Sequence, residues 1–436
     1  MSAPAADERW SRLAAEAAAT LGAGESAAAA ALRRSGREAF AAQGLPHTRL
    51  EEWRYTSLAP LAALDWRLPA AGASEIARDA VEALASPVFA CGLLVFANGR
   101  FVPELSTLRA PDVEVTSLAA ARRASDARLT RLGALVDAKA HPLAALATAL
   151  LDDGAWIRLP AGARLEQPLH LVFLSTGKGA PIASHPRVLI EAGRGSQAVV
   201  VQDHVSLDAE PALCNAVTEL HLGPGAKLEH VLLQRESGAA FHVSNTAAQL
   251  ERDARLGTHV VSLGGRLVRN DLAVTLAGEG AEARLSGLFL CTGERLVDNH
   301  TFVDHAVPHG TSRQLYKGVL AGRSRGVFRG RVLVRPGAQR TDARQSNPNL
   351  LLSDAAEIDG KPQLEIHADD VKCSHGSAIG RVDENALFYL RARAIDEAAA
   401  RALLVRGFAA EVLAALPEPA LADALGEAFA ELLETP

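Results

Sequence analysis

The chain has 436 residues, a formal net charge of −6 and 48% hydrophobic residues, with much alanine near both ends. This length allows about three domains. The acidic balance argues against nucleic acid or an anionic membrane surface as the main partner. No uncharged apolar stretch approaches the roughly 20 residues that cross a bilayer. Residues 1–10 do not resemble a secretory signal, and four scattered cysteines without a C-x-x-C motif indicate a reducing compartment. We therefore expect a cytoplasmic protein.

Residues 1–155 are predicted to form a mostly helical N-terminal domain. Trp10, Leu13 and Ala17 recur at helical spacing, and a second helical stretch follows at about 117–151. Between them, Asn98-Gly99 separates two apolar runs, which predicts a short hairpin near 93–102. The segment 51–56 (EEWRYT) is interpreted as a packing element because of its large aromatic side chains.

From residue 156 to residue 380 the pattern changes to alternating, strand-like runs that end in small corners. The corner residues are 162, 195, 225, 253, 280, 310 and 337. Their spacing is nearly constant, at roughly 30 residues, and such a period is typical of a repeat architecture. Stacked turns of this kind bury their inward side chains against each other. We therefore predict a mainly β protein with α-helical ends, whose core is a parallel β-helix (solenoid). A flat sandwich would not require so regular a period.

Two further patterns have weaker functional meaning. Residues 193–198 match G-x-G-x-x-A, but a strand-like run follows where a dinucleotide site requires a helix, so we interpret them as a corner. His300, Asp304, His305 and His309 lie close together in the sequence, which allows a metal site. We favour the interpretation that these four residues occupy polar positions within the solenoid.

The segment 358–376 holds the most specific candidate residues. A doubled aspartate at 369–370 breaks the strand alternation, as a corner would. Beyond it, Cys373 and His375 share one face, about 6.6 Å apart along a strand. Two ligands are too few, since a closed zinc site or an iron–sulfur cluster usually needs four. Either distant segments or another chain supply the rest, or Cys373 is a small buried hydrophobe and His375 a hydrogen-bonded histidine.

The C-terminal segment 381–436 is predicted to be a helical domain. Asp383 and Asp396 are candidate N-caps, and Pro417 and Pro419 separate the last two of three helices. We expect these helices to cover the end of the solenoid and to offer a face to a partner.

Several long motifs, in order, resemble the SufB/SufD scaffold family, whose members assemble iron–sulfur clusters. The resemblance covers nearly the whole chain and is densest at about 255–416. It is carried by the segments 51–56 (EEWRYT), 315–320 (LYKGVL), 328–330 (FRG), 337–347 (GAQRTDARQSN), 368–376 (ADDVKCSHG) and 387–391 (LFYLR). The Cys-Ser-His-Gly segment at 373–376 is similar to the SufD branch. The SufB branch more often has His-Glu-Ala-Thr there, with further cysteines upstream.

The resemblance implies a non-catalytic scaffold subunit of a SufBCD complex. It implies a heterodimer with SufB, the ATPase SufC bound by the C-terminal helices, and ATP hydrolysis by SufC alone. It also implies that His375, as a metal ligand, helps to acquire iron and to build a transient iron–sulfur cluster shared with SufB, with Cys373 as companion. A reduced flavin in the complex and a homodimer of the isolated chain are further expectations. Two alternatives are a self-sufficient SufB-like scaffold and a β-helix carbohydrate-active enzyme.

Overall fold

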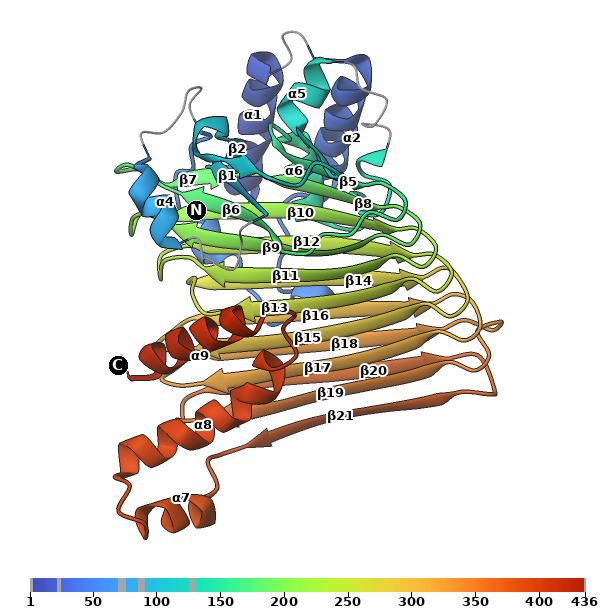
Figure 1. The fold of residues 1–436 in the computed structure, drawn as a ribbon. Coiled ribbons are helices and arrows are strands. Elements are labelled where there is room, and N and C mark those ends of the chain that lie inside the picture. Colours follow the sequence, from blue (N-terminus) through green and yellow to red (C-terminus); the bar gives the residue numbers. More distant parts are fainter. Residues whose placement is uncertain (1–2, 22–24, 70–75, 85–90, 125–130, 435–436) are drawn as a thin grey trace.

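The computed structural model describes residues 3–21, 25–69, 76–84, 91–124 and 131–434. Two long sheets face each other along most of the molecule, and the chain alternates between them (Figure 1). The N-terminal helices gather at one end of this stack, and the C-terminal helices lie along one flank. No described helix is long and apolar enough to cross a membrane.

Sheet 1 contains, in spatial order, β2 (Arg100–Phe101), β1 (Gly92–Ala97), β6 (Leu169–Ser175), β9 (Gln197–Ser206), β11 (Lys227–Arg235), β13 (Arg255–Ser262), β15 (Glu282–Cys291), β17 (Thr311–Leu320), β19 (Asp342–Leu351) and β21 (Lys372–Gly380), with β3 (Thr107–Leu108) beside β1. Sheet 2 contains β20 (Glu357–Ile366), β18 (Arg325–Val334), β16 (Leu296–His305), β14 (Leu267–Leu276), β12 (Phe241–Leu250), β10 (Ala212–Leu222), β8 (Arg187–Ala192), β5 (Gly154–Leu159) and β4 (Glu114–Ser117), with β7 (Ile182–Ser184) beside β10. From β5 to β21 the strands pair in parallel, one turn apart.

This arrangement confirms the predicted solenoid. Paired residues lie one turn apart in the sequence, and the turns differ in length: Phe241 pairs with Leu267 in a short turn, and Arg325 pairs with Glu357 in a longer one. The predicted corners fall between strands of the two sheets, and several have a residue with positive φ, where a turn favours glycine. These residues are Gly162, Gly195, Gly225, Asp253, Gly280 and His309. The G-x-G-x-x-A segment is the corner between β8 and β9, as predicted.

The interior has an apolar half and a polar half. Near the glycine-rich corners, inward side chains such as Leu222, Leu228 and Leu250 form the main hydrophobic cluster. Toward the opposite corners, buried inward positions carry His204, His242 and other polar residues. Because a buried polar group needs a partner, this half of the interior is where chemistry or specific hydrogen bonding is concentrated.

The N-terminal elements cover the first turns of the solenoid. They are α1 (Ala3–Leu21), α2 (Ala27–Gln43), η1 (Glu51–Trp53), α3 (Ala59–Ala62), α4 (Arg78–Leu84), η2 (Pro103–Leu105), α5 (Leu118–Arg123) and α6 (Pro142–Ala149). Trp10 stacks on Trp66, which meets Phe241 of β12 edge-on, so these helices pack on the outer face of sheet 2. The hairpin of β1 and β2 turns at Asn98-Gly99, and β1 extends sheet 1. The division of the chain into three domains remains a prediction.

Within the helical stretch expected at 117–151, residues 125–130 lie outside the described part of the chain. The described residues form two short helices, α5 and α6. The strand β4 precedes α5 and pairs antiparallel with β5, so this segment joins the edge of sheet 2.

The C-terminal segment forms α7 (Glu384–Arg391), α8 (Glu397–Leu413) and α9 (Pro419–Glu434). Asp383 and Asp396 cap α7 and α8, as predicted. The expectation that these helices cover the end of the solenoid is wrong. Instead, α8 and α9 lie on the outward face of sheet 1, because that face presents apolar side chains to them. The contacting strand residues include Val201, Val231, Leu233, Val261, Leu288 and Val319.

Candidate functional site

The last turn of the solenoid, β20 and β21, is open to solvent. β20 hydrogen-bonds only to β18, and β21 only to β19, among the strands of the described residues. The corner between them contains Asp369-Asp370, where the sequence predicted a break. Ile366 is 41% exposed and Ile379 is 58% exposed at this end. An uncovered sheet edge flanked by apolar side chains is a surface for strand pairing.

Cys373 and His375 lie on the inward face of β21. They pair in register with Ala343 and Gln345 of β19, both of which are buried inside the solenoid. Cys373 is half-buried and contacts the hydrophobic core, whereas His375 is exposed. His375 is exposed although it faces inward, because no described strand follows β21 to cover it.

Cys373 carries a protonated thiol, and the amide side chains of Gln345 and Gln314 lie beneath His375. Burial raises the pKa of the Cys373 thiol, so the thiol keeps its proton at neutral pH in the isolated chain. Beneath His375, the Nε2 of Gln345 donates to the Oε1 of Gln314 over 3.2 Å. A Cβ on Gly330 would lie 1.9 Å from that Nε2, so a side chain at position 330 would displace the Gln345 amide. The open end therefore presents two metal-capable side chains above buried polar side chains.

Among the described residues, the candidate histidines at 300–309 do not converge into a group of metal ligands. His300 lies in a charged cluster, with its Nε2 3.0 Å from Asp298 and its Nδ1 3.7 Å from Asp271. Burial opposes protonation, but the Asp298 carboxylate raises the pKa of His300 to about 9. His305 instead contacts the Ser312 hydroxyl at 2.9 Å, and burial lowers its pKa to about 4. A protonated imidazole is a poor ligand, which excludes His300, and His305 instead hydrogen-bonds to Ser312, so both are polar positions within the solenoid.

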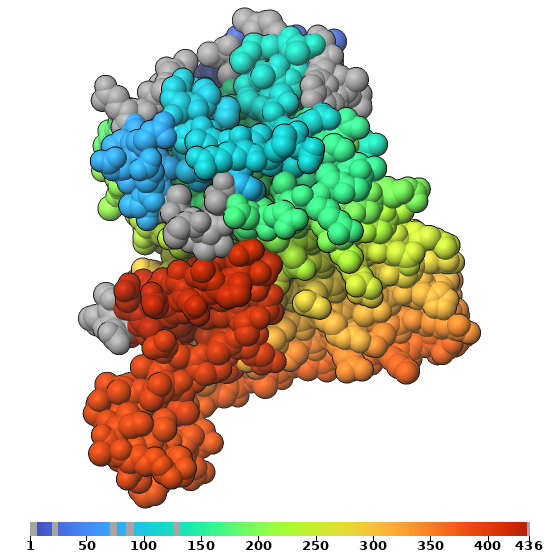
Figure 2. Space-filling view, viewed as in Figure 1, coloured from blue at the N-terminus to red at the C-terminus, as the bar shows by residue number. Residues whose placement is uncertain are grey.

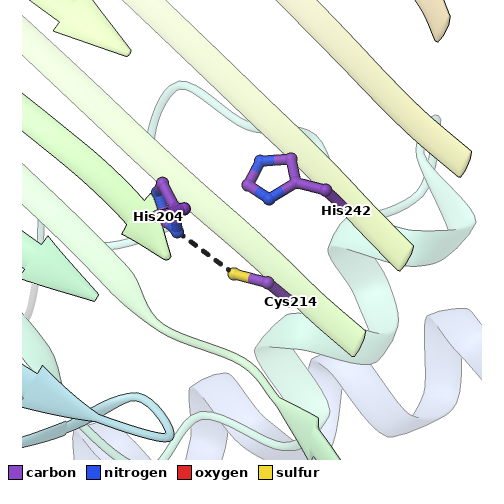
Figure 3. Close-up of side chains that lie close together, drawn as sticks. All are labelled: His204, Cys214 and His242. Carbon is purple, nitrogen blue, oxygen red and sulfur yellow. Dashed lines mark hydrogen bonds between the residues drawn. The ribbon is translucent and has the colours of Figure 1, made fainter. Parts of the chain in front are cut away.

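A second group of metal-capable side chains lies deep inside the solenoid and was missed by the sequence interpretation. His204 of β9, Cys214 of β10 and His242 of β12 converge from three strands (Figure 3). One ligand atom from each lies within 4.8 Å of the others, and Nδ1 of His204 is 3.4 Å from the Sγ of Cys214. Cys214 and His242 are register partners one turn apart, but the solenoid period is only nearly constant, so it could suggest this pair without fixing its register.

Comparison with known protein families assigns both parts of this architecture. Residues 5–171 match the SufBD protein N-terminal region, and residues 173–408 match the SufBD core domain of the SUF system for FeS cluster assembly. The chain belongs to the SufBD family. The core-domain match runs from β6 to α8 and therefore includes both the open end and the buried group.

Relatives within the SufBD family align with most of the chain. An iron–sulfur cluster assembly SufBD family protein of Synechocystis is 35% identical, over 86% of this chain and 84% of its own length. The iron–sulfur cluster assembly protein SufD of Escherichia coli is 32% identical, over 87% of each chain. SufD of Bacillus subtilis is 28% identical, over 64% of this chain and 63% of its own. The protein is thus a SufBD-family iron–sulfur cluster assembly protein that resembles SufD.

Proposed function

We propose that the chain is a non-catalytic scaffold subunit of a cytoplasmic SufBCD-type complex. In this proposal it pairs with a SufB-type subunit through β20 and β21, and it binds a SufC-type ATPase through its C-terminal helices. The observation that carries the proposal is the open last turn, where Cys373 and His375 face inward without a covering strand among the described residues.

The form of this end supports a partner that is itself a solenoid. A parallel edge strand offers its unpaired N–H and C=O groups to another strand, and main-chain hydrogen bonds then continue the sheet. Ile366 and Ile379 would be buried by such a partner. The SufBD family supplies partners with the same core domain, so a second family member fits the end by both shape and chemistry.

The chemistry of Cys373 and His375 supports a shared site. An imidazole and a thiolate are good ligands for iron, but two ligands leave a cluster incomplete. A partner chain would supply the others, including a cysteine. Metal binding displaces the thiol proton, so Cys373 can become a thiolate ligand although burial raises its pKa in the isolated chain. His375 and Cys373 would thereby take part in acquiring iron and forming the nascent cluster, which is cargo rather than a resident cofactor. We extend the proposal to a reduced flavin in the complex.

The ATPase surface is proposed for α7, which together with the start of α8 forms a lobe that projects from the rest of the chain (Figure 2). Phe388 is 74% exposed and Tyr389 is 56% exposed on this helix. Large exposed aromatic side chains on a short projecting helix are typical of a protein interface. ATP hydrolysis would then belong to the partner, in keeping with a non-catalytic role.

The alternatives predict different behaviour. A self-sufficient SufB-like scaffold would assemble a cluster without a partner. A carbohydrate-active enzyme has no support, since both matching family models describe SufBD proteins.

The test compares His375→Ala and Cys373→Ala with wild type in the complex reconstituted with SufB- and SufC-type partners. We expect His375→Ala to lower cluster yield by roughly tenfold or more, because even the outer partners of metal ligands contribute 10–100-fold. Complex formation and melting temperature should stay near wild type, since His375 is exposed. His367→Ala is the matched control, because His367 contacts Glu365 at 3.1 Å on the outward side of the same turn.

Normal cluster yield with His375→Ala would reject the role of this residue. A large fall in melting temperature would instead make His375 a packing residue. Cluster assembly by the chain without any partner would favour the SufB-like alternative.

A further inference from the structure

The buried group of His204, Cys214 and His242 has unused ligand capacity. His204 is 1% exposed, Cys214 2% and His242 0%. The Nε2 atoms of both imidazoles have no hydrogen-bond partner among the described residues. Because buried polar atoms are nearly always paired, two orphaned imidazole nitrogens beside a thiol are unusual. A bound ion would satisfy the Nε2 of His242, while the nitrogen of His204 that faces the thiol is its Nδ1.

Glu236 prepares one of these imidazoles as a ligand. Its Oε2 lies 2.7 Å from Nδ1 of His242 and also accepts from the Nε2 of Gln234 over 3.1 Å. The carboxylate can only accept a hydrogen bond, so the His242 Nδ1 carries the proton and Nε2 carries the lone pair. Metal-binding histidines are commonly oriented in this way by a carboxylate on the other ring nitrogen.

The donor set and its spacing suit a tetrahedral ion. Zinc bond lengths of about 2.3 Å to sulfur and 2.0–2.1 Å to nitrogen place these two atoms about 3.6 Å apart. The Nδ1 of His204 is 3.4 Å from the Sγ of Cys214. The separations within the group are at most 4.8 Å, so the widest of them would have to shorten by about 1 Å on binding. One thiolate and the nearby Glu236 carboxylate would together neutralise a divalent cation in this interior.

We propose that His204, Cys214 and His242 bind one divalent transition-metal ion of the Zn²⁺ type, with Glu236 orienting the His242 imidazole. On binding, the Cys214 thiol loses its proton to solvent and the sulfur becomes a thiolate ligand. The competing explanation is a metal-free network in which the thiol donates its hydrogen to His204.

A cavity adjoins the group on the side of the N-terminal helices. This cavity has a volume of about 500 Å³ and is lined by Ser184, His185 and Asp153 among others. The Ser184 side chain lines this cavity and also interacts with the Cys214 thiol, so it links the cavity to the group. The group lies near the N-terminal helices, several turns away from β21, and the proposal is independent of the cluster site at the open end.

The test is metal binding to the purified full-length chain after treatment with a chelator. Zn²⁺ alone is titrated by calorimetry, and Co²⁺ alone is used as a spectroscopic probe. We expect one tight equivalent per chain, a thiolate-to-cobalt charge-transfer band, and a rise in melting temperature on adding Zn²⁺. Cys214→Ser and His242→Gln should abolish the tight equivalent and the band.

Two controls separate this site from other thiols. Cys291→Ala removes a buried cysteine whose Sγ donates to the Arg295 carbonyl over 3.2 Å, and it should leave binding unchanged. The double variant Cys373→Ser/His375→Ala removes the open-end residues and should also keep the tight equivalent. If the double variant lost the tight Zn²⁺ equivalent, or if Cys214→Ser bound Zn²⁺ as the wild type does, the proposal would be overturned. Should Cys214→Ser fail to fold, the absence of a Zn²⁺-dependent rise in the wild-type melting temperature overturns it as well.

Discussion

At the scale of single residues, the charged cluster around His300 explains the EEWRYT segment. The carboxylate of Glu52 lies 3.7 Å from Nδ1 of His300, and the guanidinium of Arg269 stacks over Trp53 at 3.9 Å. The Thr56 hydroxyl donates to Asp298 over 2.5 Å. The segment is therefore a packing element, as predicted, and it fastens the N-terminal region to β14 and β16 through charge as well as apolar contact.

This cluster should make stability depend on pH. The folded pKa of His300, about 9, lies above its ordinary value of 6.5, so its contribution is complete below pH 6.5 and is lost as pH rises through 9. The hydrogen bond with His300 lowers the pKa of Glu52 to about 2. The contribution of Glu52 to stability is therefore complete above its ordinary pKa of 4.5 and is lost as the pH falls toward 2. The charged groups facing His300 are Glu52, Asp271, Asp298 and Arg269.

We therefore expect His300→Gln to destabilise the protein most near pH 6, by at most about 3 kcal/mol for a shift of this size. The difference from wild type should shrink toward pH 9.5, as measured by urea unfolding at both pH values. His47→Gln, at an exposed histidine, is the control and should change little. A destabilisation that is equal at both pH values, or larger at high pH, would contradict the assignment of a charged His300.

Sequence patterns could predict one of the two candidate sites but not the other. The period-two alternation is local, so it correctly placed Cys373 and His375 on one face. The buried group depends on which residues of different turns are neighbours. Because the turns of the solenoid differ in length, the register of Cys214 with His242 does not follow from the average period. His204 comes from the facing sheet, and its position depends on how the two sheets pack.

At the scale of elements, the C-terminal helices divide into a packed part and a projecting part. α8 and α9 bury Val405, Val412 and Phe429 against sheet 1, and the Nζ of Lys317 donates to the Phe408 carbonyl over 2.9 Å. The helices and caps could be predicted from local sequence. Their location could not, because it depends on which outer face of the solenoid is apolar.

The ATPase surface is best tested by a point change, since deleting the whole tail would uncover the apolar face of sheet 1. We expect Phe388→Glu to abolish co-purification of the SufC-type ATPase, because it places a charge in a proposed aromatic contact. The melting temperature should stay unchanged, given that Phe388 is 74% exposed. Leu108→Glu is the matched control, at an apolar residue of β3 that is 40% exposed and lies outside the C-terminal helices. If Phe388→Glu still bound the ATPase with wild-type affinity, the docking surface would not lie at Phe388 of α7.

At the scale of the whole molecule, the two ends of the solenoid differ. At the N-terminal end, short antiparallel strands such as β4 complete the sheets, and helices pack over the first turns. At the C-terminal end, β20 and β21 keep parallel geometry to the last residue and have no covering strand among the described residues. The asymmetry leaves one end suited to join another solenoid.

In the absence of a SufB-type partner, the open ends of two copies should therefore pair with each other. We expect the purified chain alone to form a concentration-dependent homodimer in sedimentation velocity experiments. Ile379→Lys should shift it to monomer, because a charge at a 58% exposed edge position would have to be buried in the pair. Leu108→Lys, on the edge strand β3 and 40% exposed, is the control and should leave the dimer intact. A wild-type chain that stays monomeric at all concentrations, or a dimer that survives Ile379→Lys and dissociates with Leu108→Lys, would show that the open end does not drive self-association.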